Sequence, residues 1–200
     1  SKLRLRYDEF ILNADHDYGL FMNKIRTEGY LDTSIIMIAS DHGESFERNH
    51  LAHRGPDLYN NLIHIPLIIR MPKQKTSKII DQPAEQIDVA PTILDLLNID
   101  IPQWMEGESM KKAMEGSAMS HKPKFSMQLE GNRVEGKIAR GTIAVMKDDY
   151  KYIFYLDKQK SELYNMKNDP QERTDLVKIE KMRADAMHRL ITQSIFKRKD

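Results

Sequence analysis

An acidic residue and a histidine stand side by side directly after an apolar run, in the stretch IIMIASDHGES that covers residues 35–45. The pair is Asp41 and His42, and a carboxylate and a neutral imidazole are both ligands for a divalent cation. The carboxyl end of a strand in an open α/β sheet is also where such folds usually bind ligands. Gly43 follows and is expected to let the backbone turn sharply. The pair predicts part of a metal site; the competing interpretation is that Asp41 caps a turn and His42 is an ordinary loop histidine.

The loop that follows adds side chains that could act on a charged substrate. The stretch ERNHLAHRGPDLYNN supplies His50, His53 and Arg54 within a dozen residues of the Asp-His pair. A protonated histidine or an arginine can hold an anionic oxygen, and a histidine can also give a proton to a leaving group. The alternative is a polar surface loop that happens to be rich in histidine. Together with Asp41 and His42, these residues favour a catalytic site after the strand.

The composition is that of an ordinary globular protein and narrows the classes of partner. The chain has 200 residues, of which 40% are hydrophobic and 30% charged, with a formal net charge of +1. That charge gives no bulk electrostatic reason to expect nucleic acid or a membrane surface as partner, and no apolar run is long enough to span a bilayer. The absence of cysteine excludes a disulfide or a cysteine nucleophile within this stretch but does not fix the compartment. Without an initiator Met or an apolar leader, we expect the chain to begin partway into a longer protein.

Hydrophobic periodicity predicts the elements that must position the candidate site. Apolar residues recur at three- and four-residue spacing over residues 7–27, which predicts an amphipathic helix. Continuous apolar runs predict strands over residues 34–39 and 62–70, covered on both faces as in a parallel sheet. Pro66 indicates a sheet edge or a bulge in the second run, and Asp88 is expected to be the N-cap of a short helix. This order of elements favours an α/β layer architecture.

The character of the sequence changes in its second half. The stretch AMEGSAMSHKPK is small, polar and irregular, which is typical of a domain boundary. Short apolar runs separated by turn residues follow within residues 125–165 and predict an antiparallel sheet, and residues 176–196 are expected to form an amphipathic helix. We therefore expect an α/β domain over residues 1–118 and a small α+β domain over residues 119–200.

Four longer stretches occur in a recognisable order. TSIIMIASDHGE reads as a strand that ends in Ser-Asp-His-Gly, HRGPDLYNNLIHIPLIIRMP contains a Pro-Leu-Ile strand, and IDVAPTILDLLNIDIP contains an Asp-x-x-Pro-Thr helix. The fourth stretch is KYIFYLDKQKSELYNMKNDPQERTDL. Together they cover nearly the whole chain and resemble the sulfatase family of the alkaline-phosphatase superfamily. The resemblance implies an alkaline-phosphatase-like sandwich, with helices covering a mostly parallel sheet, plus a small C-terminal antiparallel sheet with a helix.

The resemblance also implies roles for individual residues. Asp41 and His42 fall on two ligands of the family's divalent cation, for which we expect Ca²⁺, with Mg²⁺ or Mn²⁺ as alternatives. His53 falls on, or next to, the His or Lys that contacts the substrate's sulfate, and His50 is the competing candidate because the loop length varies in the family. The family's Cys/Ser-x-Pro-x-Arg motif, matured to formylglycine, and two further Asp ligands are missing. We expect them upstream of Ser1.

The implied function is hydrolysis of a sulfate ester of a small molecule or carbohydrate, by a metal-dependent nucleophilic mechanism. Without the nucleophile, the isolated fragment is expected to be inactive, and apolar surface that the upstream half would cover is expected to make it self-associate. One alternative is a phosphate or phosphonate ester hydrolase, or a phosphoglycerol-type transferase, of the same superfamily. Another is a degenerate module without catalytic activity. The upstream nucleophile would discriminate, because Cys or Ser indicates a sulfatase and Thr indicates phosphoryl transfer.

Overall fold

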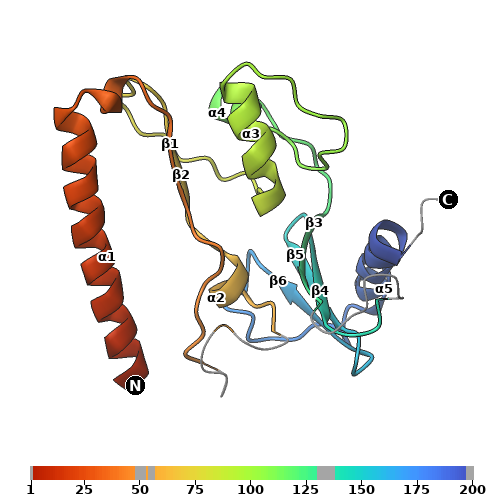
Figure 1. Ribbon diagram of the computed structural model, residues 1–200. Helices are drawn as coiled ribbons and strands as arrows, with labels where there is room; N and C mark the ends of the chain where they lie inside the picture. The colour runs from red at the N-terminus through yellow and green to blue at the C-terminus, as the bar shows by residue number, and fades with distance from the viewer. Residues whose placement is uncertain (1, 48–52, 54–56, 130–137, 197–200) are drawn as a thin grey trace. The chain divides into compact units, whose positions relative to one another are not determined.

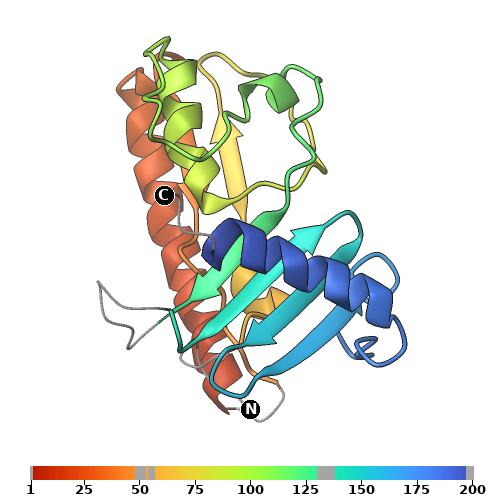
Figure 2. The same cartoon turned by 90° about the vertical axis from the view of Figure 1, so that its right-hand side faces the viewer.

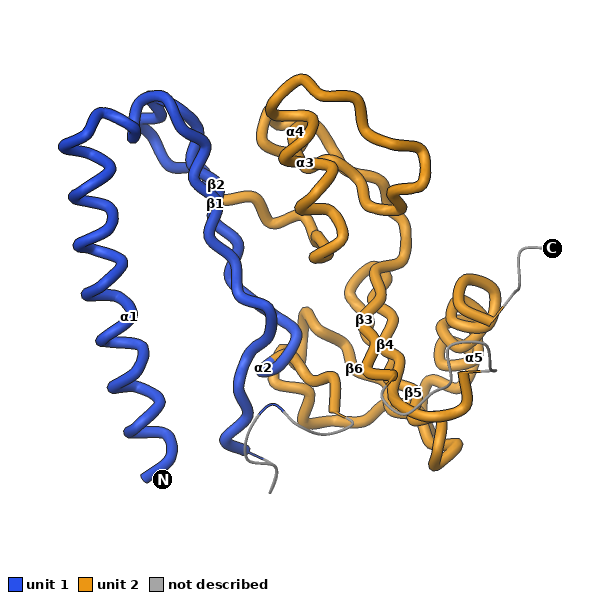
Figure 3. Tube along the Cα trace, viewed as in Figure 1, with its two compact units in different colours: residues 1–55, 61–78 blue, residues 56–60, 79–200 orange. Residues whose placement is uncertain are grey.

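The computed structural model describes residues 2–47, 53, 57–129 and 138–196. The chain separates into two compact units (Figure 3): unit 1 comprises residues 1–55 and 61–78, and unit 2 comprises residues 56–60 and 79–200. Figure 1 gives the labels of the helices and strands. These units reflect contacts within this chain alone. The division of the protein into domains at residues 118 and 119 stays a prediction.

Unit 1 begins with a long helix whose apolar side chains are accessible. α1 (Lys2–Thr27) confirms the predicted amphipathic helix, begins at Lys2 rather than at residue 7, and contains no buried residue. Several large apolar side chains are more than half exposed, namely those of Leu5, Phe10, Ile11, Leu12, Leu20 and Phe21. Exposed apolar surface of this kind favours association. Self-association of the isolated chain stays a prediction. None of the helices in the described part of the chain has the length and apolar character needed to cross a membrane.

The two strands of unit 1 pair with each other. β1 (Ile36–Ala39) and β2 (Leu67–Arg70) are antiparallel, with Ile36 opposite Arg70 and Ala39 opposite Leu67. The prediction that both apolar runs share one sheet is confirmed, but these two strands are not parallel to each other. A continuous apolar run indicates a strand that is buried on both faces. It does not indicate whether that strand runs parallel or antiparallel to its neighbour.

The second strand begins later than its apolar run. Within the predicted strand over residues 62–70, the chain first completes one turn of helix, α2 (Asn60–Ile63). β2 starts only after Pro66. Proline has no N–H group to donate to a ladder, so pairing begins at the next residue.

Gly43 lets the loop after β1 approach the backbone of α2. Its N–H donates a hydrogen bond to the Leu62 carbonyl at 2.7 Å, and the Asn61 side chain donates to Ser45 Oγ at 3.0 Å. A Cβ atom at position 43 would lie 2.1 Å from the Asn61 carbonyl oxygen. The φ angle of Gly43 lies outside the left-handed region. The residue is therefore required for close approach, and the expected sharp turn stays a prediction.

Unit 2 contains an antiparallel sheet with a helix on one face (Figure 2). The strands follow the order β3 (Lys124–Gln128), β4 (Thr142–Lys147), β5 (Tyr150–Tyr155) and β6 (Lys160–Asn165). α5 (Lys181–Ile191) covers the sheet and continues into a π-helical turn, Thr192–Phe196. The core between sheet and helix contains Ile143, Val145, Tyr152, Phe154, Leu163, Ala184, Met187 and Ile191. The predicted sheet and helix are confirmed, and the helix begins at Lys181 rather than at residue 176.

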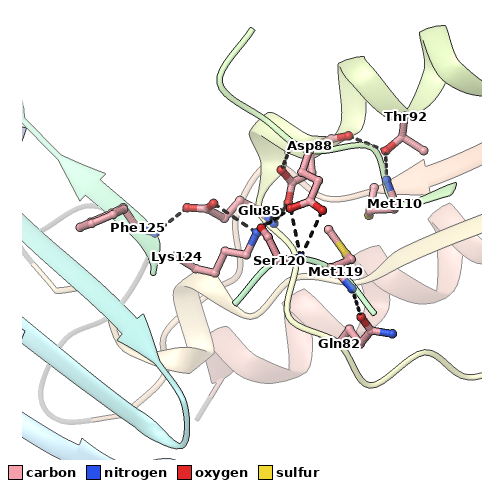
Figure 4. Close-up of polar contacts among 10 residues, drawn as sticks. Gln82, Glu85, Asp88, Thr92, Met110, Met119, Ser120, Lys124 and Phe125 are labelled. Carbon is pink, nitrogen blue, oxygen red and sulfur yellow. Dashed lines mark hydrogen bonds and ion pairs between the residues drawn. The ribbon is translucent and has the colours of Figure 1, made fainter. Parts of the chain in front are cut away.

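A polar cluster joins the turn before α3 to the start of β3 (Figure 4). η2 (Gln86–Asp88) leads into α3 (Val89–Leu96), and Asp88 is 1% exposed. The Asp88 carboxylate accepts hydrogen bonds from the backbone N–H groups of Glu85 (2.9 Å) and Glu108 (2.7 Å), and it lies 3.4 Å from Lys124 Nζ. Buried charges are stable only when they are paired and hydrogen-bonded in this way.

Asp88 and Thr92 bind the backbone of the segment that follows α3 and do not cap the helix with their side chains. Asp88 stands at the N-cap position of α3, as predicted, but its side chain makes no cap hydrogen bond with that helix. Thr92 Oγ donates to the Asp88 carbonyl at 2.6 Å and accepts from the N–H of Met110, which precedes α4 (Lys111–Met114). The polar residues of the Asp-x-x-Pro-Thr motif therefore have a structural function in this chain.

A buried ion pair fixes Asn60 to the sheet of unit 2. Lys151, on β5, is completely buried, and its Nζ lies 2.5 Å from the carboxylate of Glu172, which is 2% exposed. Lys151 Nζ also donates to Asn60 Oδ1 at 3.1 Å, and the Asn60 N–H donates to Glu172 Oε2 at 2.7 Å. The two charges and the amide satisfy one another away from water, which is the condition for burying an ion pair.

A second buried carboxylate, that of Glu162, binds Tyr59, the residue before Asn60. Glu162 Oε2 accepts hydrogen bonds from the hydroxyl groups of Tyr59 (2.7 Å), Tyr155 (3.2 Å) and Tyr164 (3.1 Å), and Lys160 donates to Oε1 at 2.7 Å. Burial raises the pKa of Glu162, but the hydrogen bonds from Lys160 and Tyr59 outweigh burial and hold that pKa below its usual value. Tyr59 and Asn60 are thus both anchored on the sheet by buried carboxylates.

Removal of the Lys151 ammonium should destabilise unit 2 strongly. Lys151→Met leaves Glu172 buried without its counter-charge, and we expect a loss of about 3–5 kcal/mol in the free energy of unfolding. Lys147→Met, at an exposed position on β4, is the matched control. The double variant Lys151→Met/Glu172→Met should recover part of the loss, because both charges are then absent. Urea unfolding followed by circular dichroism measures the difference; equal midpoints for Lys151→Met and Lys147→Met would contradict the account.

Replacement of Gly43 by alanine tests the close approach to α2. The added Cβ meets the Asn61 carbonyl, so the loop or α2 must shift, and we expect a loss of about 1–3 kcal/mol in unfolding free energy. Gly19→Ala is the control, because no atom lies within 4 Å of a Cβ at that position of α1. There the change should stabilise the helix by about 0.5–1 kcal/mol. A Gly43→Ala variant as stable as the wild type in urea would show that the approach is not a constraint.

Candidate active site

Local hydrogen bonds fix the chain where β1 ends. Ser40 Oγ donates to the carbonyl of His42 at 2.6 Å, and the N–H of His42 donates to Asp41 Oδ1 at 3.0 Å. The other carboxylate oxygen of Asp41, Oδ2, lies 3.8 Å from His42 Nε2. Both side chains remain accessible, at 87% for Asp41 and 46% for His42. The carboxylate and the imidazole are therefore directed to a common region outside the strand end.

The hydrogen bonds of His42 leave one ring nitrogen available to a metal. His42 Nδ1 lies 2.8 Å from the Gly43 carbonyl oxygen. A carbonyl only accepts, so Nδ1 carries a proton, and in the neutral ring Nε2 has the lone pair. A backbone carbonyl on the second nitrogen is also the usual support of a metal-binding histidine.

Asp41 and His42 fit two positions around one divalent cation. Donor atoms that each lie about 2.0–2.6 Å from an ion are typically some 3–4 Å apart, as Asp41 Oδ2 and His42 Nε2 are. Within residues 2–47, 53, 57–129 and 138–196, no group of three or more His, Asp or Glu side chains is arranged to hold a metal. The two residues thus fit as part of a metal site that needs further ligands.

His53 lies against this pair. Its ring stacks on that of His42, with a centroid distance of 4.3 Å and an interplanar angle of 26°. Of the predicted site residues, Asp41, His42 and His53 are brought together, whereas His50 and Arg54 lie outside the described residues. Their roles stay predictions. The arrangement combines two cation ligands with a second imidazole that could move a proton.

Glu44 contacts the predicted site residue His53, and the sequence pattern did not indicate it. Its Oε2 lies 3.2 Å from His53 Nδ1, and its side chain is 17% exposed, compared with 43% for His53. Glu44 directly follows the Asp-His-Gly run and precedes His53 by nine residues. Nothing in the local pattern distinguishes it from an exposed loop carboxylate, which is the commoner state of glutamate.

Comparison with known protein families gives two overlapping matches. The family described as "Sulfatase" matches residues 2–99, and the family described as "N-sulphoglucosamine sulphohydrolase, C-terminal" matches residues 53–199. An arylsulfatase of Clostridium perfringens is 25% identical over 201 residues, which covers 98% of this chain and 40% of the relative. The uncharacterized sulfatase YidJ of Escherichia coli K12 is 32% identical over 169 residues, which covers 82% of this chain and 32% of YidJ. A Delta 4,5-hexuronate-2-O-sulfatase of Bacteroides thetaiotaomicron is 29% identical over 155 residues, which covers 72% of this chain and 31% of that protein.

Solved structures resemble this chain over most of its length. A 2-O GAG sulfatase is 28% identical with a TM-score of 0.67, and the match covers 81% of this chain and 36% of that one. The phosphonate monoester hydrolase of Silicibacter pomeroyi shares the fold, with a TM-score of 0.72 at 23% identity, over 91% of this chain and 38% of that one. The chain spans well under half the length of each of these relatives. It belongs to the sulfatase family of the alkaline-phosphatase superfamily, and it corresponds to the C-terminal part of these proteins.

Proposed function

We propose that this chain is the C-terminal part of a divalent-metal-dependent sulfatase that hydrolyses sulfate esters. One observation carries the proposal: Asp41, His42 and His53 lie together in a chain of the sulfatase family. Asp41 Oδ2 and His42 Nε2 are 3.8 Å apart, and the ring of His53 stacks on that of His42. Cation ligands and a proton donor are the two functions that this part of a sulfatase site needs.

Asp41 and His42 would hold the cation through the carboxylate and through Nε2. The proton on His42 Nδ1, bonded to the Gly43 carbonyl, keeps the ring in the tautomer that this role requires. Ca²⁺ is favoured, with Mg²⁺ or Mn²⁺ as alternatives, because carboxylate ligands expected upstream suit hard cations. When bound, the cation neutralises negative charge on the sulfate oxygens. A formylglycine, also expected upstream, supplies the nucleophile for the sulfur atom.

His53 would act on the leaving group. As the bond between sulfur and the ester oxygen breaks, that oxygen gains negative charge, and a proton from the His53 ring neutralises it. The need for this proton increases with the pKa of the departing alcohol. His50, outside the described residues, is the second candidate for the same role.

A sulfated carbohydrate is the substrate class that we favour. Two of the similar proteins are named as a hexuronate-2-O-sulfatase and a 2-O GAG sulfatase, and both act on sulfated sugars according to these names. The hydroxyl group of a sugar is a poor leaving group, so such a substrate needs the proton from His53. The names of these similar proteins and the leaving-group chemistry thus favour the same substrate class.

Hydrolysis of a phosphate or phosphonate ester is the second candidate. It is favoured by the fold shared with the phosphonate monoester hydrolase, since tetrahedral sulfate and phosphonate groups offer similar oxygens to a cation. A phosphoglycerol-type transferase is a variant of this alternative. Turnover of matched aryl sulfate and aryl phosphonate substrates by the full-length protein distinguishes the two classes, and no turnover of either would favour a degenerate binding module.

Loss of either predicted metal ligand should abolish activity. In the full-length protein, Asp41→Ala and His42→Ala should each lower kcat/KM for an aryl sulfate by roughly 10³-fold, because several kcal/mol of charge stabilisation is removed. Asp185→Ala, which removes an exposed carboxylate on α5, is the control and should be unaffected. The isolated 200-residue chain should show no turnover with Ca²⁺, Mg²⁺ or Mn²⁺. Metal-dependent turnover by that chain, lost in Asp41→Ala, would instead place a complete site within it.

Loss of His53 should matter most for poor leaving groups. In His53→Ala, we expect kcat/KM to fall about 10²–10⁴-fold for an alkyl or sugar sulfate, and less than roughly tenfold for 4-nitrophenyl sulfate. The measurement is a comparison of sulfate esters whose alcohols span several pKa units. An equal loss for all esters would exclude His53 as the proton donor and leave His50 as the candidate.

A further inference from the structure

The carboxylate of Glu44 holds the ring of His53. Glu44 Oε2 lies 3.2 Å from His53 Nδ1, which is hydrogen-bond distance. An ionised carboxylate accepts hydrogen bonds and cannot donate them, so the pairing places the proton on Nδ1. With Nδ1–H held by Glu44, the proton that the ring can give to a substrate is the one carried on Nε2.

Two contacts together define the orientation of the His53 ring. The bond from Nδ1 to Glu44 limits rotation of the ring, and the stack on His42 sets its plane. Side chains that must present one atom to a reacting group need such restraints, because small misplacements lower the rate sharply. The same loop therefore carries the predicted metal ligand His42, the ring of His53 and the carboxylate that orients it.

Glu44 is poorly suited to a purely structural role. Its Oε1 atom is buried and has no hydrogen-bond partner among the described residues. An unsatisfied buried polar atom costs about 1–3 kcal/mol, and more when the group is charged. Glu162 shows the structural arrangement in the same chain, since both of its carboxylate oxygens accept hydrogen bonds. The contact of Glu44 with His53 explains a carboxylate that stability alone disfavours.

A direct bond to the cation is the competing role of Glu44. The described residues contain no group of three such side chains that could hold a metal, so Glu44 is not arranged with Asp41 and His42 as a third ligand. Its recorded partner is the imidazole of His53. The geometry thus separates the two carboxylates of the loop, one beside the predicted metal ligand and one beside the predicted proton donor.

We propose that Glu44 is the positioning residue of His53: it accepts the bond from Nδ1–H and thereby presents the Nε2–H group of the doubly protonated ring to the leaving oxygen of the ester, which takes the Nε2 proton. The inference rests on the proposed role of His53. Glu44 acts only through that ring and makes no contact with the substrate in this account.

The test is a double-mutant cycle in the full-length protein. Glu44→Ala should lower kcat/KM about 10–100-fold for an alkyl or sugar sulfate and less than roughly threefold for 4-nitrophenyl sulfate. In the His53→Ala background, the further change Glu44→Ala should have no added effect, because its target is already gone. Glu44→Gln, whose amide oxygen can still accept from Nδ1–H, should lie between the wild type and Glu44→Ala.

Independent readouts separate this role from the alternatives. The Kd for Ca²⁺, measured by titration calorimetry, should stay within roughly threefold of wild type in Glu44→Ala and rise about 10-fold or more in Asp41→Ala. If Glu44→Ala weakens Ca²⁺ binding as Asp41→Ala does, Glu44 is a ligand and the inference is wrong. If Glu44→Ala does not fold, the test is made with Glu44→Gln. An equal loss of kcat/KM for the sugar sulfate and for 4-nitrophenyl sulfate, or no loss for either, overturns the positioning role.

The outcome also distinguishes this inference from the proposed function. A leaving-group effect in His53→Ala that is absent from both Glu44 variants overturns the positioning role and leaves the role of His53 intact. No leaving-group effect in His53→Ala overturns both. Losses confined to poor leaving groups in both single variants, with a double variant no more impaired than His53→Ala, support both.

Discussion

The close contact between Gly43 and α2 is the constraint on which the candidate site depends. The Gly43 N–H bonds to the Leu62 carbonyl, and no side chain larger than hydrogen fits between the two backbones. This contact fixes the middle of the loop that carries Asp41, His42 and Glu44. The Gly43 carbonyl in turn accepts the His42 Nδ1 proton and so selects the ring nitrogen that is left for a metal. Gly43 therefore takes part both in the contact that sets the path of the loop and in the hydrogen bond that sets the tautomer of the predicted ligand His42.

α2 is itself held at its first residue by buried charges. Asn60 takes part in the Lys151–Glu172 ion pair, and the preceding Tyr59 bonds to Glu162. Asn61 and Leu62, next along the chain, bond to the loop after β1. Glu162 accepts hydrogen bonds on both carboxylate oxygens, whereas Glu44 has one oxygen atom without a hydrogen-bond partner among the described residues.

Local sequence patterns predicted most of the helices and strands and the residues that make up the candidate site. The three- and four-residue spacing of apolar residues predicted α1, and turn residues between short apolar runs predicted the antiparallel sheet of unit 2. Asp41 and His42 could be singled out because ligand-type residues follow an apolar strand. His53 could be singled out because it lies in the next loop. These inferences need only neighbours in sequence, and the structure brings the three residues together.

The features that the sequence did not reveal depend on distant contacts. The bonds from Tyr59 to Glu162 and from Asn60 to Glu172 join residues 103 and 112 positions apart, so no local pattern could indicate that these carboxylates are buried. Lys151 looks like a solvated strand residue until its partner is known. The direction of β2 relative to β1 and the role of Gly43 likewise follow from pairing with other segments. Glu44 was missed for the same reason, since its meaning comes from the ring of His53.

The central claim is that Asp41 and His42 are ligands of a divalent cation in a sulfatase. Its most direct test is a crystal structure of the full-length protein with Mn²⁺, in which anomalous scattering locates the ion. The account predicts one anomalous peak bonded to the Asp41 carboxylate and to His42 Nε2, with His42 Nδ1 still on the Gly43 carbonyl. An ion bound by other residues while Asp41 and His42 remain unligated, or a bond through His42 Nδ1, would contradict it.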